Sequence, residues 1–237
     1  MSWYLKIKSK IEKKDDSPEL KRGQMKQILI SEFERGLPEF DFLEYRNGCC
    51  TFQNTRIING RNINEYLHVI FALKDRNFSC SVASRINKNY LNSNSYNSGL
   101  INPHIDLLVL KKGTGIIPAE EAYYFHNGRV KTTTEIIELI VNDFKEFGKS
   151  FLQKQAKQFE NNDLLKTGFD FIENLEIDKS ILNEELGKDI NSAGLLTSNP
   201  YLKLKSELQS VKGIDRETRK NIPRLTYELL EFYCEDK

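Results

Sequence analysis

Residues 40–85 decide the fold, and they read FDFLEYRNGCCTFQNTRIINGRNINEYLHVIFALKDRNFSCSVASR. Apolar, β-branched and aromatic residues fill four runs of this stretch, and short turn sequences separate the runs, which lie at 40–46, 49–58, 65–74 and 77–85. Two of the separators are Asn47-Gly48 and Asn59-Gly60, and a tight hairpin needs such residues because both of its turn positions have positive φ. The stretch therefore predicts an antiparallel β-meander.

Helix signals lie on both sides of the meander. Before it, Ser17-Pro18-Glu19 has the order of an N-cap, a first-turn proline and a first-turn acid, which predicts a helix that runs toward Glu34. After it, Thr132-x-x-Glu135 has the pattern of a capping box, and apolar residues recur at helical spacing from Ile137 to Leu152. We expect both helices to pack on the sheet.

The remaining patterns complete an α+β architecture. We predict a buried strand at 105–110, a short strand at 122–125, and C-terminal helices at 163–175, 180–190, 200–211 and 223–234. The expected organisation is a charged N-terminal arm (1–16), an α+β core (17–162) and a helical C-terminal region (163–237) packed on the core.

The composition limits the cellular compartment and the classes of partner that we expect for this protein. Lys and Arg number 35 against 34 Asp and Glu, so the charge balance gives no push toward nucleic acid or an anionic membrane. No apolar run approaches the ~18–20 residues that span a bilayer. Cys49, Cys50, Cys80 and Cys234 lack CxxC spacing, so reduced thiols are expected rather than a disulfide or zinc site. We predict a cytoplasmic protein with no cofactor, no metal and no membrane contact.

Candidate chemistry rests on three residues, because the chain lacks GxxxxGKS/T, GxGxxG, HExxH, GxSxG and HxE…CxxC motifs. His104 and Asp106 alternate on a strand and therefore face the same side, as a base and its orienter or as two metal ligands would. Alternatively, His104 ties the loop to the strand by hydrogen bonds, and this is the interpretation we favour. His126 could join the pair if its strand is a neighbour, or could be a turn histidine. His68 is expected on the open face of a strand, without chemistry.

An Asn-rich segment at 87–102 is the predicted binding loop. Together with His104 and Asp106, the candidate binding residues are Tyr96, Asn97 and Asn102. Such a loop is long, and long ordered loops commonly have a role. Arg85, Lys88 and Tyr90 could instead meet a phosphate and a stacked base, but no nucleic-acid-binding module accompanies them, and nucleic acid is not the expected partner.

The predicted order of a helix, a meander and a long packed helix resembles the small α+β immunity proteins that bacteria encode beside polymorphic toxins. The resemblance covers residues 17–160 and rests on the Asn47-Gly48 hairpin, the strand at 64–74 and the helix begun by Thr132. It implies a cytosolic defence protein that neutralises a protein partner by binding it. Abundant Asn, Lys and Ile also suggest an AT-rich bacterial genome.

Two other functions stay open at this point. One is a hydrolase or nuclease-like enzyme that uses His104 and Asp106 with His126. The other is a structural or regulatory subunit that docks to a partner through its helical C-terminal region, at about 163–237. The sequence leaves the oligomeric state open.

Overall fold

The computed structural model describes residues 15–72, 76–85, 104–113, 117–118, 121–180, 182 and 199–235. Its contacts divide the chain into two units, each of which is built from several separate segments. The first unit takes Met1–Arg56, Asn64–Ser84 and His104–Lys154. The second takes Ile57–Ile63, Arg85–Pro103 and Gln155–Lys237, so the position 163 that was predicted as a boundary lies inside it.

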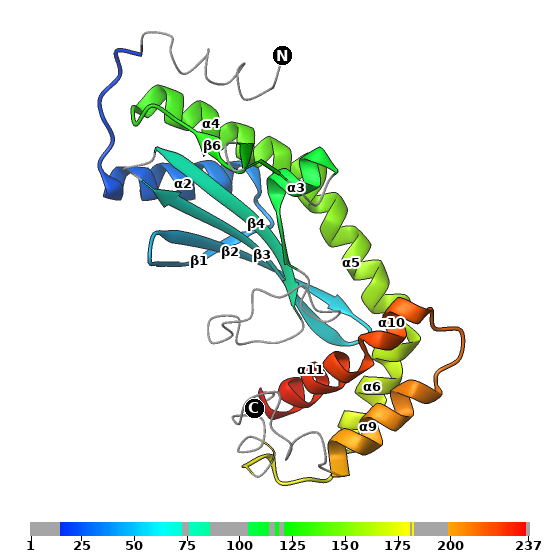
Figure 1. The fold of residues 1–237 in the computed structure, drawn as a ribbon. Helices are drawn as coiled ribbons and strands as arrows, with labels where there is room; N and C mark the ends of the chain where they lie inside the picture. Colours follow the sequence, from blue (N-terminus) through cyan, green and yellow to red (C-terminus); the bar gives the residue numbers. More distant parts are fainter. Residues whose placement is uncertain are drawn as a thin grey trace. The chain divides into compact units, whose positions relative to one another are not determined.

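The sheet of the first unit is the predicted meander with two short additions (Figure 1). Its strands β1 (Asp41–Arg46), β2 (Cys49–Ile58), β3 (Arg61–Ala72) and β4 (Asn77–Arg85) are neighbours in that order. Both additions pair antiparallel with β4: β5 (His104–Asp106) opposite residues 81–83, and β6 (Tyr124–Phe125) opposite residues 77–78. The short strand predicted at 122–125 is thus confirmed in its second half.

Both Asn-Gly turns have the predicted backbone. Asn47 and Gly48 have φ of 51° and 84°, and Asn59 and Gly60 have φ of 51° and 77°. Positive φ at both central residues defines the hairpin turn whose twist matches that of the flanking strands. The local chemistry of these four residues therefore sets the register of β1, β2 and β3.

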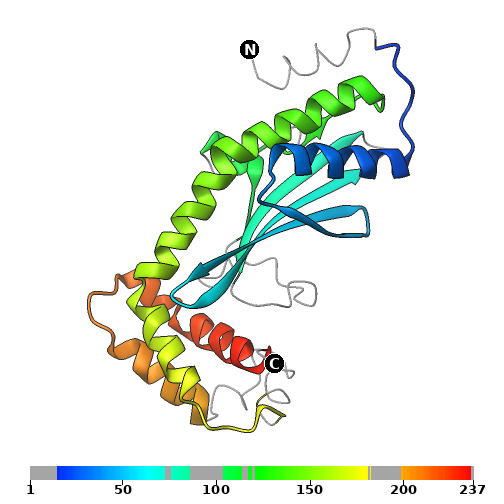
Figure 2. The same cartoon turned by 180° about the vertical axis from the view of Figure 1, so that it is seen from behind.

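Two helices cover one face of this sheet (Figures 1 and 2). They are α2 (Arg22–Gly36) and α4 (Val130–Asp143), and they also contact each other. Alternate residues of β2, β3 and β4 point into the core that the helices complete; its members include Met25, Leu29, Phe33, Cys50, Phe52, Leu67, Val69, Phe78, Cys80, Val82, Ile137 and Ile140. The predicted α+β class, with an N-terminal and a long central helix on a meander, is confirmed.

The long central helix is continuous through three segments. A π-helical turn, η3 (Phe144–Gly148), joins α4 to α5 (Lys149–Asn161). Helix α4 begins at Val130, so Thr132 lies inside the first turn, and the capping box predicted from Thr132 and Glu135 is wrong. The caps come instead from a distant part of the chain.

Those caps are Asp15 and Ser17, which were predicted to precede and to open the N-terminal helix. Asp15 Oδ2 accepts the Thr132 backbone N–H at 3.1 Å and its hydroxyl at 2.6 Å, and Ser17 Oγ accepts the Lys131 N–H at 3.0 Å. The helix predicted from Ser17 begins only at Arg22, with Lys21 as its N-cap. The segment that carries Asp15 and Ser17 is therefore attached to the start of α4.

Asp15 should stabilise the first unit in a pH-dependent way. Hydrogen bonds from Ser17 and then Thr132 hold the pKa of the Asp15 carboxyl well below its usual range. A depressed pKa stabilises the folded state above pH ~4, and the stabilisation is lost as the pH falls below that value. We expect Asp15→Ala to lower the Tm by ~2–4 °C at pH 6, as loss of a cap does, and by less at pH 3.

The matched control for Asp15 is Asp16→Ala, because the neighbouring carboxyl is exposed and is not the one that accepts the hydrogen bonds from Thr132. Thermal unfolding followed by circular dichroism should show no comparable change for this control. An equal loss of Tm at both pH values for Asp15→Ala would contradict the proposed capping by a charged carboxylate.

The second unit is a helical cluster that includes the turn between β2 and β3. Its helices are α6 (Asp163–Glu173), α9 (Asn199–Ser210), α10 (Arg216–Lys220) and α11 (Ile222–Glu235), which confirm three of the four predicted C-terminal helices. The fourth, at 180–190, lies almost wholly outside the described residues. Buried residues from α6, α9 and α11 form one core with Phe159 of α5 and Ile63 of β3; they include Leu164, Leu165, Phe169, Leu204, Leu208, Leu225 and Leu229.

Polar contacts also hold the β2–β3 turn in the second unit. The Arg61 guanidinium pairs with Glu173 and lies 4.3 Å from the centroid of the Phe169 ring. Asn59 Nδ2 donates to the Glu160 carbonyl oxygen at 3.3 Å. These contacts attach the β2–β3 turn to the helices of the second unit.

The buried strand predicted at 105–110 is wrong. Strand β5 ends at Asp106, and helix α3 (Leu107–Lys112) follows at once. Asp106 Oδ1 accepts the Leu108 N–H at 2.8 Å and so caps the helix, which ends at Gly113 with a φ of 66°. A run of apolar residues is compatible with a buried strand and with a buried helical turn. The cap formed by Asp106 therefore determines that this run is a helix.

Candidate functional site

His104 and Asp106 share strand β5 but have different tasks. They lie opposite Ala83 and Ser81 of β4. His104 Nε2 is hydrogen-bonded to Ser81 Oγ at 2.9 Å, whereas the Asp106 carboxylate caps α3. Burial raises the pKa of the Asp106 carboxyl. The hydrogen bond to Ser81 joins strand β5 to strand β4.

His126 lies on the opposite face of the sheet from Ser81 and His104. It is buried, its Nδ1 accepts the Gly128 backbone N–H at 3.0 Å, and Thr133 Oγ1 lies 3.1 Å from the same nitrogen. Its ring is 4.9 Å from that of Phe78, which points into the helix-covered core, whereas Ser81 points to the opposite face. His126 therefore does not join His104 and Asp106, although β6, the strand just before it, pairs with β4 as β5 does.

The environment of His126 keeps its imidazole neutral. Burial, followed by the charge of Arg76, lowers the pKa of His126 to about 4. With Nδ1 accepting a backbone N–H, the ring fastens the turn that precedes α4. This is a structural task.

The three predicted binding residues of the loop, Tyr96, Asn97 and Asn102, lie outside the described residues. Their role stays a prediction.

The side chain of His68 lies beside that of His104, and the sequence did not predict this proximity. His68 lies on the face opposite the helix-covered core, as expected, but it is buried there, with only 4% of its surface exposed. His68 Nδ1 is 3.2 Å from Thr51 Oγ1, and its ring centroid is 6.3 Å from that of His104. Thr51, His68, His104 and Ser81 thus form a hydroxyl–imidazole row on the face of the sheet that α2 and α4 do not cover.

Strand parity was the signal that could have found this row. Cys50 and Phe52 of β2, Leu67 and Val69 of β3, and Val82 of β4 face the core. The residues next to them in sequence must then face the other side. What the pattern alone could not supply is the register that places β5 beside β4.

A second polar cluster lies inside the first unit. Asp143, the last residue of α4, is buried, and both of its carboxylate oxygens lie 2.8 Å from Lys111 Nζ. The Tyr124 hydroxyl donates to Asp143 Oδ2 at 2.9 Å. Burial and the negative charge of Asp143 raise the pKa of Tyr124 well above its usual value. The cluster fixes α3, β6 and the start of the π-helical turn to one another.

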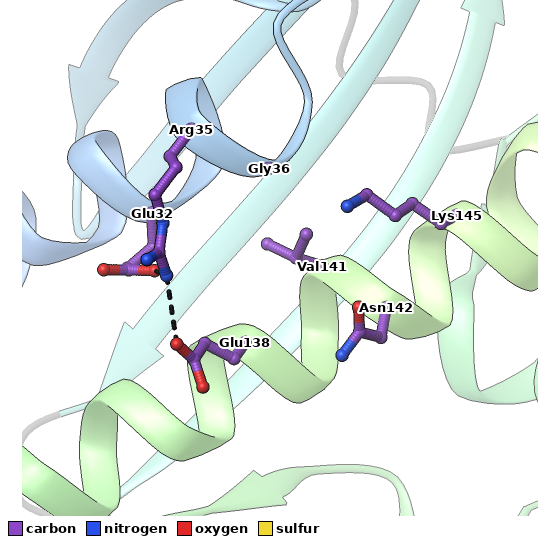
Figure 3. Close-up of a pocket in the computed structure, with 7 residues that line it drawn as sticks. All are labelled: Glu32, Arg35, Gly36, Glu138, Val141, Asn142 and Lys145. Atoms are coloured by element: carbon purple, nitrogen blue, oxygen red, sulfur yellow. Dashed lines mark hydrogen bonds and ion pairs between the residues drawn. The ribbon is translucent and has the colours of Figure 1, made fainter.

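A charged depression opens on the solvent side of the helix layer, between α2 and α4 (Figure 3). We call it the α2–α4 depression; its lining residues are Glu32, Arg35, Gly36, Glu138, Val141, Asn142 and Lys145. Arg35 bridges the two helices, because Nη2 lies 3.0 Å from Glu138 Oε1 and also pairs with Glu32. A Cβ at Gly36 would lie 2.5 Å from Val141 Cγ1, so glycine permits this close approach.

Two further findings concern the whole described chain. Within the residues described above, no three His, Cys, Asp or Glu side chains are grouped so that they could hold a metal ion. Over the same residues, no helix is both long and apolar enough to cross a bilayer.

Comparisons of the chain with family models, with curated proteins and with solved structures find no match.

Proposed function

We propose that the chain is a cytoplasmic protein-binding module that neutralises a protein partner in bacterial defence, as immunity proteins do. The observation that carries this proposal is the α2–α4 depression. Gly36 and the nearly buried Val141 give it an apolar floor, and Arg35, Glu138 and Lys145 give it an exposed charged rim. An apolar centre with a polar rim is the anatomy of a protein interface, and the rim charges would select the partner.

The cysteines support the cytoplasmic part of the proposal. All four are thiols, and three are buried. Burial raises the pKa of the Cys50 thiol to about 12 and that of Cys80 well above its usual value. Protonated, buried thiols persist in a reducing compartment, where disulfides are rare.

The test is a quantitative pull-down from native lysate with the tagged chain and two variants. In Arg35→Glu/Lys145→Glu the charge of the rim is reversed, and Lys166→Glu/Lys203→Glu makes the same change at two exposed positions elsewhere. We expect one stoichiometric protein to be retained by the wild type and by the control, and its recovery to fall at least about tenfold for the rim variant.

Two outcomes would contradict this proposal. Recovery of the chain alone would remove the binding function. Equal recovery of the partner by the rim variant would remove the depression as its site, and loss of the partner on replacing residues 87–102 would then assign the contact to the predicted loop.

A second candidate function is hydrolysis, and the hydrogen bond between Ser81 and His104 favours it. A hydroxyl within hydrogen-bond reach of an imidazole is the arrangement of a nucleophile and its base. A fluorophosphonate probe tests it, because an activated serine oxygen attacks phosphorus and releases fluoride. Labelling should be abolished by Ser81→Ala and by His104→Ala but kept by Ser79→Ala, which changes another serine of β4. Absence of labelling in the wild type would remove this candidate.

A further inference from the structure

Strand β1 leaves one edge of the sheet open. Among the described strands it pairs only with β2, and in both views no strand lies along its outer side (Figures 1 and 2). The opposite end of the sheet is different, since β4 is flanked by the very short strands β5 and β6. An open edge presents unpaired backbone groups that can pair with another strand. Of the described strands, β1 is thus the one suited to extend the sheet.

The sequence of β1, DFLEYR, is complementary to itself when it is read antiparallel. A two-fold axis between Leu43 and Glu44 places Asp41 opposite Arg46 of a second copy, and Arg46 opposite its Asp41. The same axis places Phe42 opposite Tyr45. Opposite charges and aromatic pairs across antiparallel strands are stabilising, whereas like charges are destabilising.

The observed facing of the side chains agrees with this register. Phe42 and Tyr45 lie opposite Phe52 and Cys50, whose side chains face the helix-covered core. Asp41 and Arg46 lie opposite Gln53 and Cys49, on the other face. Each proposed pair therefore joins residues on the same face of the sheet.

The irregularity in β1 lies at the centre of this register. The pairing with β2 shifts between Phe42 and Glu44, so Leu43 is an extra residue, and it is 46% exposed. In the antiparallel self-pair, the extra residue of each copy lies across from Glu44 of the other, next to the axis. The two irregularities then compensate each other, and the two exposed leucines come together.

The end charges of β1 are available for such a contact. Asp41 and Arg46 are both exposed, and neither has an ion pair within the part of the chain that the structure describes. Residues of this kind at both ends of a short edge strand also restrict which strands can pair with it, because only a complementary sequence satisfies both charges.

We propose that two copies of this chain associate through β1, antiparallel about a two-fold axis, so that their sheets become continuous. This contact uses a different surface from the α2–α4 depression and does not depend on the proposed function. A six-residue strand pair is a small interface, so the dimer is expected to be weak and concentration-dependent.

Charge exchange across the axis tests the register. Asp41→Lys places a lysine opposite Arg46 in both symmetric pairs, and Arg46→Glu places a glutamate opposite Asp41 in both. By sedimentation velocity over ~5–500 µM, each variant should self-associate at least about tenfold more weakly than the wild type. An equimolar mixture of the two should associate again, because the introduced lysine then lies opposite the introduced glutamate, and the remaining Arg46 lies opposite the remaining Asp41.

The control is Glu34→Lys, an exposed charge reversal on α2 that should leave the wild-type dimer unchanged. Three results would overturn the proposal: a wild-type chain that stays monomeric over the whole range, single variants that associate as the wild type does, or a mixture that stays monomeric. Restored association in the mixture also shows that both variants fold.

Discussion

Asp143→Asn is expected to lower the free energy of unfolding by about 2–4 kcal/mol. The carboxylate is buried, pairs with Lys111 through both oxygens and accepts the Tyr124 hydroxyl. Removing one member of a buried pair leaves the other without compensation for its lost hydration. Lys111 is 28% exposed and can turn partly to water, so we expect less than the full cost of an enclosed pair. Urea unfolding at pH 7 measures the difference.

A double-mutant cycle separates the ion pair from the other effects of this substitution. The double variant Lys111→Met/Asp143→Asn should lose clearly less free energy of unfolding than the sum of the two single variants. The reason is that Lys111→Met removes the lysine that Asp143→Asn alone would leave unpaired. Lys112→Met is the matched control, since that neighbouring lysine pairs with Glu121. The losses of free energy of unfolding caused by Lys112→Met and by Asp143→Asn should simply add in the double variant. Additivity in both cycles would show that the pair does not stabilise the fold.

The second large effect is a loss of stability in mild acid that depends on His126. Its pKa is lowered to about 4 in the folded chain, whereas an unperturbed histidine titrates near 6.5. Between these values the unfolded chain takes up a proton that the folded chain does not, so stability falls as the pH falls. The expected contribution of His126 between pH 7 and pH 5 is about 2 kcal/mol, measured as the change in the free energy of unfolding in urea.

His126→Asn provides the comparison, because its side-chain oxygen can still accept the Gly128 N–H while nothing titrates. The variant should lose less stability than the wild type between pH 7 and pH 5. This window also excludes Asp15, whose stabilising effect is lost only below pH ~4. Equal pH dependence in the two proteins would show that His126 is protonated as easily in the folded chain as in the unfolded one.

The sheet could be predicted because its determinants are local. Side chains alternate along each strand, and the Asn47-Gly48 and Asn59-Gly60 turns carry their conformation in two residues each. The start of α4 could not be predicted in the same way, since its caps, Asp15 and Ser17, lie more than 110 positions away in the sequence. When the capping residues come from a distant segment, the residues around the start of a helix do not contain a complete capping motif from which that start could be predicted.

Which of the candidate residues come together could not be predicted for a related reason. The alternation of His104 and Asp106 was read correctly as one strand, but the carboxylate of Asp106 caps the next helix. Whether His126 joins them depends on which face of β4 each approaches, and that is a property of the sheet pairing. His68 and the Lys111–Asp143–Tyr124 cluster were missed because their members come from elements whose neighbours only the folded chain reveals.

The β2–β3 turn has a consequence for how the chain folds during its synthesis. Ile63 belongs to a core whose other members lie between Phe159 and Cys234. A ribosome adds ~5–20 residues per second, so this side chain leaves the exit tunnel about 10–30 s before the last of its neighbours exists. During that interval the nascent chain displays an unfinished apolar surface to chaperones, and any fragment that stops before α6 keeps it. The second unit, to which the turn and Ile63 belong, therefore cannot finish folding until Cys234 has been made.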